Sequence, residues 1–149
     1  LIPALALALA AVAADAKDSG LVFVSSEKDH ALTVLDAKTL EIQGTIATCK
    51  RPRHLQFLPG REQLLVACSD SNAADVIDPA TGKSVKRVSL GDEPEAFDLS
   101  PDGKTIYVSN EDEGAASFVD AATGKVLRTV KVGEEPEGVK VSADGKTLY

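Results

Sequence analysis

The stretch PEAFDLSPDGKTIY, residues 94–107, returns as PEGVKVSADGKTLY at residues 136–149. Eight of the fourteen positions are identical, and most of the others exchange one apolar residue for another. Both copies contain an Asp-Gly pair, which favours a tight hairpin turn, between two apolar runs. The chain therefore repeats a structural unit rather than a single short motif.

A period of 42 residues runs through the chain. It appears in two independent landmarks, the prolines Pro52, Pro94 and Pro136 and the aspartates Asp36, Asp78 and Asp120. Periods of about 40–50 residues are typical of propeller blades and of some helical repeats. Short β-branched and aromatic runs bounded by turn residues, such as LVFVSS (21–26) and TIYVSN (105–110), favour strands. Because the aspartate recurs in every repeat, we expect it to cap a turn and not to act in catalysis.

Each repeat predicts four short strands. In the repeat that starts at Pro94 they cover about Glu95–Ser100, Thr105–Asn110, Ala115–Asp120 and Lys125–Val132. Four antiparallel strands per repeat make one blade of a β-propeller, so the fold class is all-β. The predicted blades cover about 20–48 (without the innermost strand), 52–90 and 94–132, and a fourth begins at 136–149.

Three blades and part of a fourth are too few for a closed ring, because propellers close with about four to eight blades. We therefore expect this chain to be a fragment of a longer propeller. We also expect a later C-terminal strand to complete the first blade. The fragment is not expected to fold alone, because its end blades would expose unpaired edges and apolar faces.

The first segment, LIPALALALAAVAADA (1–16), is apolar and ends in small residues. This pattern predicts an N-terminally truncated signal peptide, hence a periplasmic or secreted bacterial protein. A short buried helix or a lipid-facing anchor is the open alternative. The run is too short to predict membrane insertion, since a spanning helix needs about 20 apolar residues.

The chain has a net charge of −7 and a pI near 4.8. It lacks the basic surface on which nucleic-acid binding depends, so no nucleic-acid partner is expected. An acidic chain also has no electrostatic attraction to anionic membranes.

Several stretches resemble the YVTN-type β-propeller repeat. They are YVSN at 107–110, FVD at 118–120, TGK at 123–125 and the segment that starts at Pro136. The stretches RPR (51–53), ACSDS (67–71) and YVSNED (107–112) are most similar to exported propellers associated with pyrroloquinoline quinone (PQQ)-dependent alcohol catabolism. The resemblance implies about seven blades in the full-length protein, which we expect to be a monomer. It also implies a non-catalytic accessory role.

In such propellers, by resemblance, ligands bind where the loop before each repeat proline and the loop after the second strand open on one face. A protein partner or a small polar ligand could bind at this rim. The alternative is ordinary solvated surface charge. The candidate residues are His30, Arg51, Arg53, His54, Asp70, Glu93, Glu95, Glu111, Asp112, Glu135 and Glu137.

The charge at the rim changes sign between repeats. Arg51 aligns with Glu93 and Glu135, and Arg53 aligns with Glu95 and Glu137. Packing requirements are the same in each blade, so they do not explain this change. It points to a mixed-charge rim, although exposed ion pairs would contribute only about 0–1 kcal/mol each.

Cys49 and Cys68 could form a disulfide in an oxidising compartment, or each could be a small buried hydrophobic residue. Together with His30 and His54 they fit no compact metal motif, so no metal site is expected. No cofactor is expected either. PQQ or haem remains an alternative because His54 could lie at the channel mouth.

We find no catalytic triad or metalloprotease motif in the sequence and assign no catalytic residue. The favoured function is therefore an exported binding or accessory protein linked to PQQ-dependent alcohol oxidation. The alternatives are an enzyme of the lactonase or quinoprotein type and a haem- or redox-handling propeller that uses His54.

Overall fold

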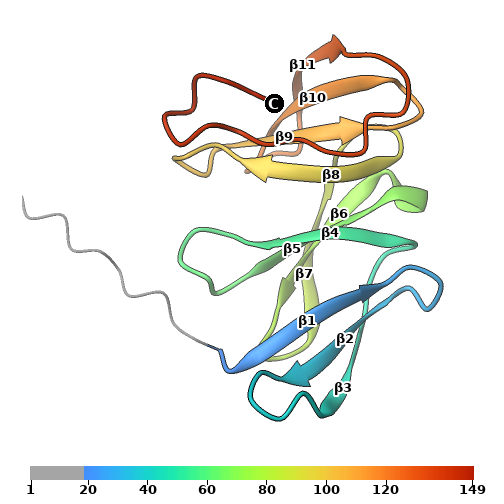
Figure 1. Cartoon of the computed structure of the whole chain (residues 1–149), viewed down its shortest axis with the longest axis vertical. Coiled ribbons are helices and arrows are strands. Elements are labelled where there is room, and N and C mark those ends of the chain that lie inside the picture. Colours follow the sequence, from blue (N-terminus) through green and yellow to red (C-terminus); the bar gives the residue numbers. More distant parts are fainter. Residues whose placement is uncertain (1–18) are drawn as a thin grey trace, which may run out of the picture.

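A computed structural model describes residues 19–149, and the predicted signal segment 1–16 lies outside them. Three antiparallel sheets follow one another along the chain (Figure 1). The first contains β1 (Leu21–Ser26), β2 (Ala31–Asp36) and β3 (Ile42–Ala47). The second contains β4 (Pro52–Phe57), β5 (Leu64–Cys68), β6 (Ala73–Asp78) and β7 (Lys83–Ser89), with a short 3₁₀ turn, η1 (Ser69–Ser71), after β5. The third contains β8 (Pro94–Leu99), β9 (Thr105–Asn110), β10 (Ala115–Asp120) and β11 (Val126–Lys131).

The predicted all-β propeller architecture is confirmed. Within each sheet every strand pairs with the next one in the sequence, which is the meander of a propeller blade. The four strands of the third sheet lie within one residue of their predicted bounds. The aspartates act as predicted at their turns: the Asp78 carboxylate accepts the Ala80 N–H at 2.8 Å, and Asp120 accepts the Thr123 N–H at 2.8 Å.

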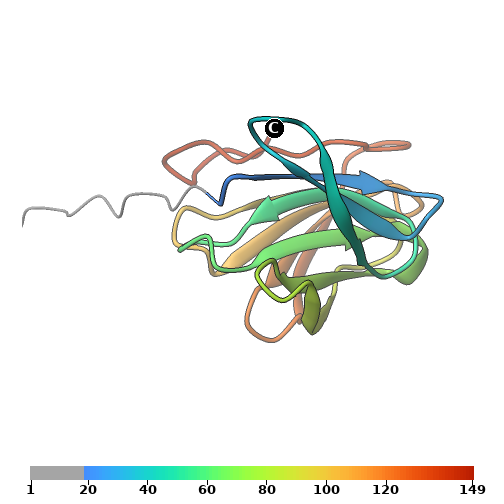
Figure 2. The same ribbon diagram turned by 90° about the horizontal axis from the view of Figure 1, so that it is seen from below.

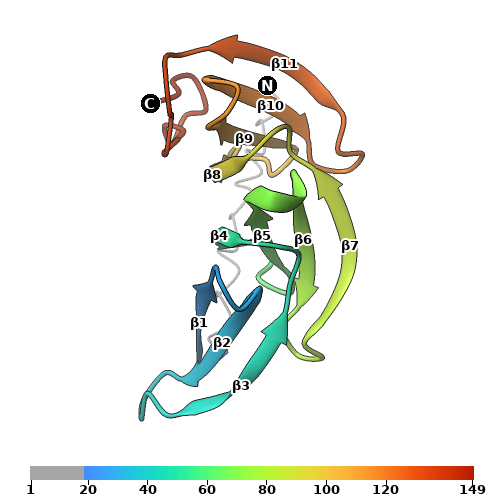
Figure 3. The ribbon, with the colours of Figure 1, turned by 90° about the vertical axis from the view of Figure 1, so that its right-hand side faces the viewer.

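The three sheets are arranged as a fan, with β4 and β8 at its concave edge and β3, β7 and β11 at its convex edge (Figure 3). Figure 2 looks along the row of sheets, with the first sheet in front. Apolar side chains fill the two spaces between neighbouring sheets. One core contains Leu32, Ile46, Leu64 and Ile77, from the first and second sheets. The other contains Leu65, Val88, Phe97 and Val119, from the second and third sheets. The second blade therefore buries both of its faces against its neighbours, as blades inside a propeller do.

Residues 140–149 form a hairpin that is assigned one isolated bridge, between Val141 and Leu148, where the repeat predicts strands. Beside the bridge Lys140 and Tyr149 exchange backbone hydrogen bonds of 3.0 and 2.8 Å. The hairpin contacts the third sheet through Asp98, whose carboxylate accepts the Val141 N–H at 2.9 Å. No helix in residues 19–149 is long and apolar enough to cross a membrane.

Candidate functional site

The loops that precede β4 and β8 lie at the same end of the fan as η1 and the turns β1–β2 and β9–β10 (Figure 1). We call this end the mouth. Antiparallel pairing brings these segments together, since each inner strand starts where the second strand of its blade ends. The mouth is the rim that the sequence predicted as the binding face.

The residue before each repeat proline has an unusual backbone. Arg51, Glu93 and Glu135 have φ values of 56°, 43° and 49°, in the left-handed region that favours glycine. Such conformations persist only where the surroundings hold them, and they are often found at functional sites. Three equivalent positions thus have a charged residue where glycine would adopt the same backbone conformation with less strain.

Side chains from the preceding blade hold two of these residues in place. His30 Nδ1 accepts the Arg51 N–H at 3.0 Å, and Asn72 Oδ1 accepts the Glu93 N–H at 3.1 Å. His30 and Asn72 are themselves 42 positions apart in the sequence. His30 therefore positions the backbone of Arg51, and in the next blade the side-chain amide of Asn72 does the same for Glu93.

Irregular pairing at the start of each inner strand places the next charged residues. The register shifts between Pro52 and Leu55 in β4 and between Pro94 and Ala96 in β8. Bulges of this kind redirect side chains and are common beside binding sites. Arg53 and Glu95 lie at these two irregularities, and their side chains form an ion pair between the second and third blades.

Ion pairs connect three blades across the mouth. Arg51 Nη1 contacts Glu93 Oε1 at 2.7 Å and Asp70 Oδ1 at 3.6 Å. Glu27, from the β1–β2 turn, contacts Arg53 Nη1 at 2.9 Å and Arg51 Nε at 3.5 Å. The contacts of Glu27 and Asp70 are half exposed, so each contributes little to stability, about 0–1 kcal/mol.

Glu95 differs from the rest of the mouth because its side chain is 2% exposed. Burial raises the pKa of Glu95; the Arg53 guanidinium lowers it, and the nearby Glu111 carboxylate raises it again. A hydrogen bond with Asp112 raises the pKa of Glu93, and burial acts in the same direction. The mouth thus holds carboxyl groups close enough to disfavour one another's ionised form.

Two cavities open at the mouth. One, of about 340 Å³, is lined by Ser25, Glu27, Arg53, His54, Glu95, Ala96 and Glu137. The other, of about 530 Å³, is lined by Glu111, Asp112, Glu113, Lys131, Glu134 and Glu135 together with two glycines. The predicted residues Glu135 and Glu137 are therefore divided between the cavities, and we find no ion pair for either within the described chain.

His54 lies on β4 and is half-buried. Its ring packs edge-on against Phe97, with centroids 4.7 Å apart, and it also lines the smaller cavity. Burial lowers the pKa of His54, and Lys140 acts in the same direction against the opposing effect of Asp98. The imidazole is therefore a neutral, packed group at neutral pH.

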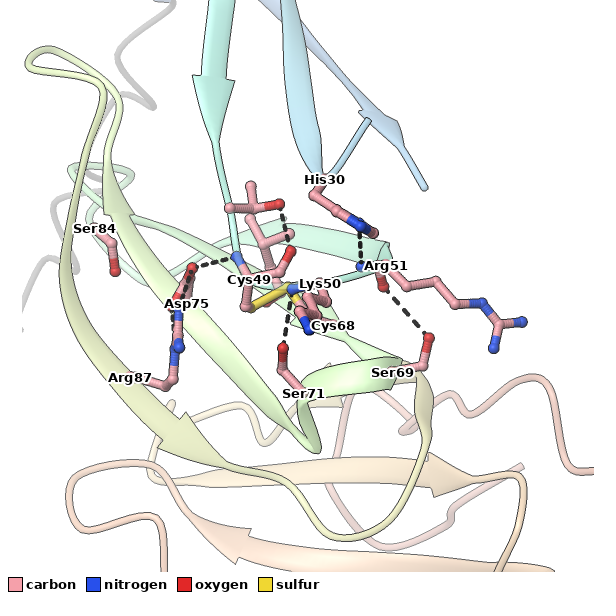
Figure 4. Close-up of a disulfide and its surroundings, with 12 residues drawn as sticks. His30, Cys49, Lys50, Arg51, Cys68, Ser69, Ser71, Asp75, Ser84 and Arg87 are labelled. Atoms are coloured by element: carbon pink, nitrogen blue, oxygen red, sulfur yellow. Dashed lines mark hydrogen bonds and ion pairs between the residues drawn. A yellow bond between two sulfur atoms is a disulfide. The ribbon is translucent and has the colours of Figure 1, made fainter. Parts of the chain in front are cut away.

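Cys49 and Cys68 form a disulfide beneath the mouth, with their Cα atoms 5.7 Å apart (Figure 4). The bond joins the loop before β4 to the end of β5. Beside it the buried Asp75 accepts the Cys49 N–H at 2.7 Å and pairs with Arg87 at 2.8 Å. The cysteines are thus linked to each other, so they do not combine with the histidines as metal ligands.

Sequence reasoning did not assign roles to Glu27, Asn72, Asp75 or Arg87 at this site. The 42-residue spacing of His30 and Asn72 was a usable signal for the loop contacts. No such signal exists for Asp75, because Ser117 takes its place in the next repeat.

The electrostatic character of the mouth is acidic. Two guanidiniums face a larger set of carboxylates, which are Glu27, Asp70, Glu93, Glu95, Glu111 and Asp112. Such a surface attracts cations or a partner with a basic surface and repels anions.

Comparison with known proteins agrees with this architecture. No curated protein matches the sequence. Among solved structures, hydrazine synthase from Kuenenia stuttgartiensis is similar, with a TM-score of 0.76 and 30% identity over 88% of this chain and 38% of that one. Dihydro-heme d1 dehydrogenase NirN, solved in complex with DHE, has a TM-score of 0.63 and 21% identity over 80% of this chain and 27% of that one. The chain thus spans well under half the length of either protein.

A sequence family matches more specifically. The profile of the YNCE-like beta-propeller family covers residues 65–148, from β5 through the C-terminal hairpin. This range includes the third blade and most of the second. Together with the blade meander and the 42-residue repeat, the match shows that this chain belongs to the YNCE-like beta-propeller family.

Proposed function

We propose that this chain is the binding part of a non-catalytic accessory protein, exported to the periplasm, that takes a basic protein partner at its mouth. The carrying observation is the buried Glu95 carboxylate, held by Arg53 and surrounded by further carboxylates. Burying a charge is costly, so a fold that places Glu95 there has a built acidic site and not only a solvated surface.

A basic partner fits this surface better than an anionic ligand. Complementary charge steers association and selects the partner, and exposed carboxylates such as Asp70 and Asp112 are accessible to lysines or arginines. The sequence resemblance supports a narrower role beside a PQQ-dependent alcohol-oxidising system. On this proposal the partner is a component of that system.

The charge of the mouth disfavours PQQ and haem, although it does not bear on ligation of a cofactor by the His54 imidazole. Both molecules carry carboxylates, and the carboxylates around Glu95 and Glu135 would repel them. Arg51 and Arg53 are already engaged by Glu93 and Glu95.

The test measures binding of the full-length protein to the PQQ-dependent alcohol dehydrogenase of the same organism. We expect saturable binding that weakens as salt rises from about 20 to about 300 mM, because screening shortens the range of charge attraction. The double variant Asp70→Asn/Asp112→Asn should weaken binding severalfold. The matched double variant Glu41→Gln/Glu62→Gln, at the opposite end of the blades, should not. Absence of binding at low salt would refute the proposed partner.

A redox role for His54 is the second candidate, favoured by its place on the wall of the smaller cavity. It is tested by the visible spectrum of the full-length protein purified from its native compartment. A chromophore that disappears in His54→Ala would replace the accessory role with a cofactor-bearing one. A colourless protein would exclude the redox reading.

A further inference from the structure

Three carboxylates at the mouth lie unusually close together. Glu93, Glu95 and Glu111 each offer an oxygen, and these oxygens all lie within 4.8 Å of one another. Ligands on opposite sides of a calcium ion are separated by about 4.6–5.2 Å, twice the calcium–oxygen distance. One ion could therefore contact all three side chains. An acidic cluster alone is common on protein surfaces, so the argument depends on a second feature.

That feature is an oxygen of Glu95 without a hydrogen-bond donor. The Glu95 side chain is 2% exposed, and Arg53 pairs with Oε2. Glu95 Oε1 is buried and has no hydrogen-bond partner among the described residues. Glu95 Oε1 lies 4.0 Å from Arg51 Nη2, and the other terminal nitrogen of Arg51, Nη1, pairs with Glu93. Oε1 is therefore on the side of Glu95 that faces Glu93. Buried acceptors are normally satisfied, and an exception calls for a missing ion or water.

The arginines leave room for a cation. Arg53 pairs with Oε2 of Glu95, and Arg51 Nη1 pairs with Oε1 of Glu93. Arg51 Nη2 lies 4.0 Å from Glu95 Oε1, beyond hydrogen-bonding distance, so Oε1 keeps its lone pairs for an ion. The positive charge of the arginines is offset by Glu27 and Asp70, which contact the same guanidiniums. The guanidiniums thereby orient the carboxylates while the mouth keeps a net negative charge.

We propose that Glu93, Glu95 and Glu111 bind one divalent cation, with Ca²⁺ as the expected ion. The donors are carboxylate oxygens, which hard cations prefer, and the three come from a strained loop, a bulge and a turn. This irregular set suits the flexible coordination of Ca²⁺ better than the strict octahedron of Mg²⁺. The sequence had predicted no metal site, and its rejected metal set consisted of Cys49, Cys68 and the two histidines. The inference goes beyond the proposed function, because an ion can bind here whether or not a protein docks.

The experiment titrates Ca²⁺ into the EDTA-treated full-length protein by calorimetry. We expect one ion per chain with a Kd on the order of 10⁻⁴–10⁻³ M, the range of extracellular modules, and weaker binding of Mg²⁺. Glu111→Gln should raise the Kd about tenfold or more, since it removes a charged ligand. The control Glu113→Gln lies two residues away in the same turn and outside the cluster, and it should leave the Kd unchanged.

Two results would overturn the site. One is the absence of saturable Ca²⁺ binding to the wild-type protein up to about 10 mM, well above the expected Kd. The other is equal weakening by Glu111→Gln and Glu113→Gln, which would indicate diffuse attraction to an acidic surface. A readout without variants is the thermal midpoint, which Ca²⁺ should raise by mass action while NaCl of equal ionic strength should not.

Partner binding is measured separately in EDTA. If the dehydrogenase binds in EDTA but Ca²⁺ does not bind, the ion site is wrong and the accessory function stands. If Ca²⁺ binds and the dehydrogenase does not, the ion site stands and the proposed partner is wrong.

Discussion

Cys49 and Gly91 occupy the same position of the 42-residue repeat, in the loops before β4 and β8, and Cys68 and Asn110 occupy equivalent positions in β5 and β9. In the second blade the two positions are joined by a disulfide. In the third blade Asn110 donates from Nδ2 to the carbonyl oxygens of Leu90 and Asp92, at 3.0 and 2.9 Å. The same loop is thus attached covalently in one blade and by an amide in the next.

The side-chain amide of Asn110 fits here because residue 91 is a glycine. A Cβ added to Gly91 would lie 2.8 Å from Asn110 Nδ2, and the φ of Gly91 is +89°. The comparison shows that the repeat conserves the attachment of the loop and not the chemistry that makes it. The charged residues that follow these loops also differ between the two blades. Arginines lie before and within β4, glutamates lie at the equivalent positions of β8, and the two sets form ion pairs with each other.

The largest loss of stability is expected when the opposite charges of Arg53 and Glu95 are made alike. Arg53→Glu gives β4 the residue found at the equivalent position of β8, and it leaves the buried Glu95 carboxylate facing a like charge. Removing one partner of a buried pair costs about 3–5 kcal/mol, so the full-length protein should lose that much stability in urea unfolding.

Lys83→Glu, an exposed charge reversal in the same blade, is the control and should change stability little. Adding Glu95→Arg to Arg53→Glu exchanges the two charges and should recover part of the loss. A variant as stable as wild type would mean that the Glu95–Arg53 pair is not formed in solution.

Removal of the disulfide is expected to have the next largest effect. The double variant Cys49→Ala/Cys68→Ala opens a loop whose ends are 19 residues apart. A disulfide that closes a loop of this length stabilises the folded protein by about 3 kcal/mol, which the variant should lose. Urea unfolding of the double variant measures the loss, with a reducing agent added to wild type as the second arm. Two free thiols in the unfolded, unreduced wild-type protein would contradict the bond itself.

Asn110→Ala tests the amide attachment of the third blade. It leaves the Leu90 and Asp92 carbonyls without their donor, for an expected loss of about 1–3 kcal/mol, smaller than that of the disulfide. The control is Asn72→Ala, where an exposed side chain accepts the Glu93 N–H. If Asn72→Ala costs as much as Asn110→Ala, burial does not distinguish the two contacts.

The smallest effect concerns the link from β8 to the C-terminal hairpin and depends on pH. Burial by itself would raise the pKa of Asp98, but hydrogen bonds from the Val141 N–H, Lys140 and the Leu99 N–H outweigh it and lower the pKa from 3.8. A lowered pKa in the folded protein adds stability above pH 3.8, which is lost as the pH falls through the folded value.

Wild type should therefore exceed Asp98→Asn in stability at pH 7, and the difference should shrink as the pH is lowered past that range. The measurement is urea unfolding of both proteins at several pH values. A difference that stays constant would show that Asp98 contributes by packing and not by its charge.

The blade meander could be read from the sequence because it depends on local patterns. The 42-residue spacing, the Asp-Gly turns and the β-branched runs predicted the strands to within one residue, and the recurring Asp78 and Asp120 predicted the turn caps. The mouth was also predictable as a place, since antiparallel pairing puts the same loops of every blade at one end. The C-terminal hairpin differs, because its pairing is limited to one bridge and the backbone hydrogen bonds beside it.

The tertiary structure decided which charges meet and which are buried. Arg53 and Glu95 are 42 residues apart, and no local pattern indicates that two bulges aim them at each other. The sequence placed His30 at the rim, and the structure shows in addition that its Nδ1 accepts the Arg51 N–H there. The proposed cation site depends on the burial of Glu95, which results from the packing of neighbouring blades. The repeat pattern gives the strands of each blade but does not show which side chains the next blade covers.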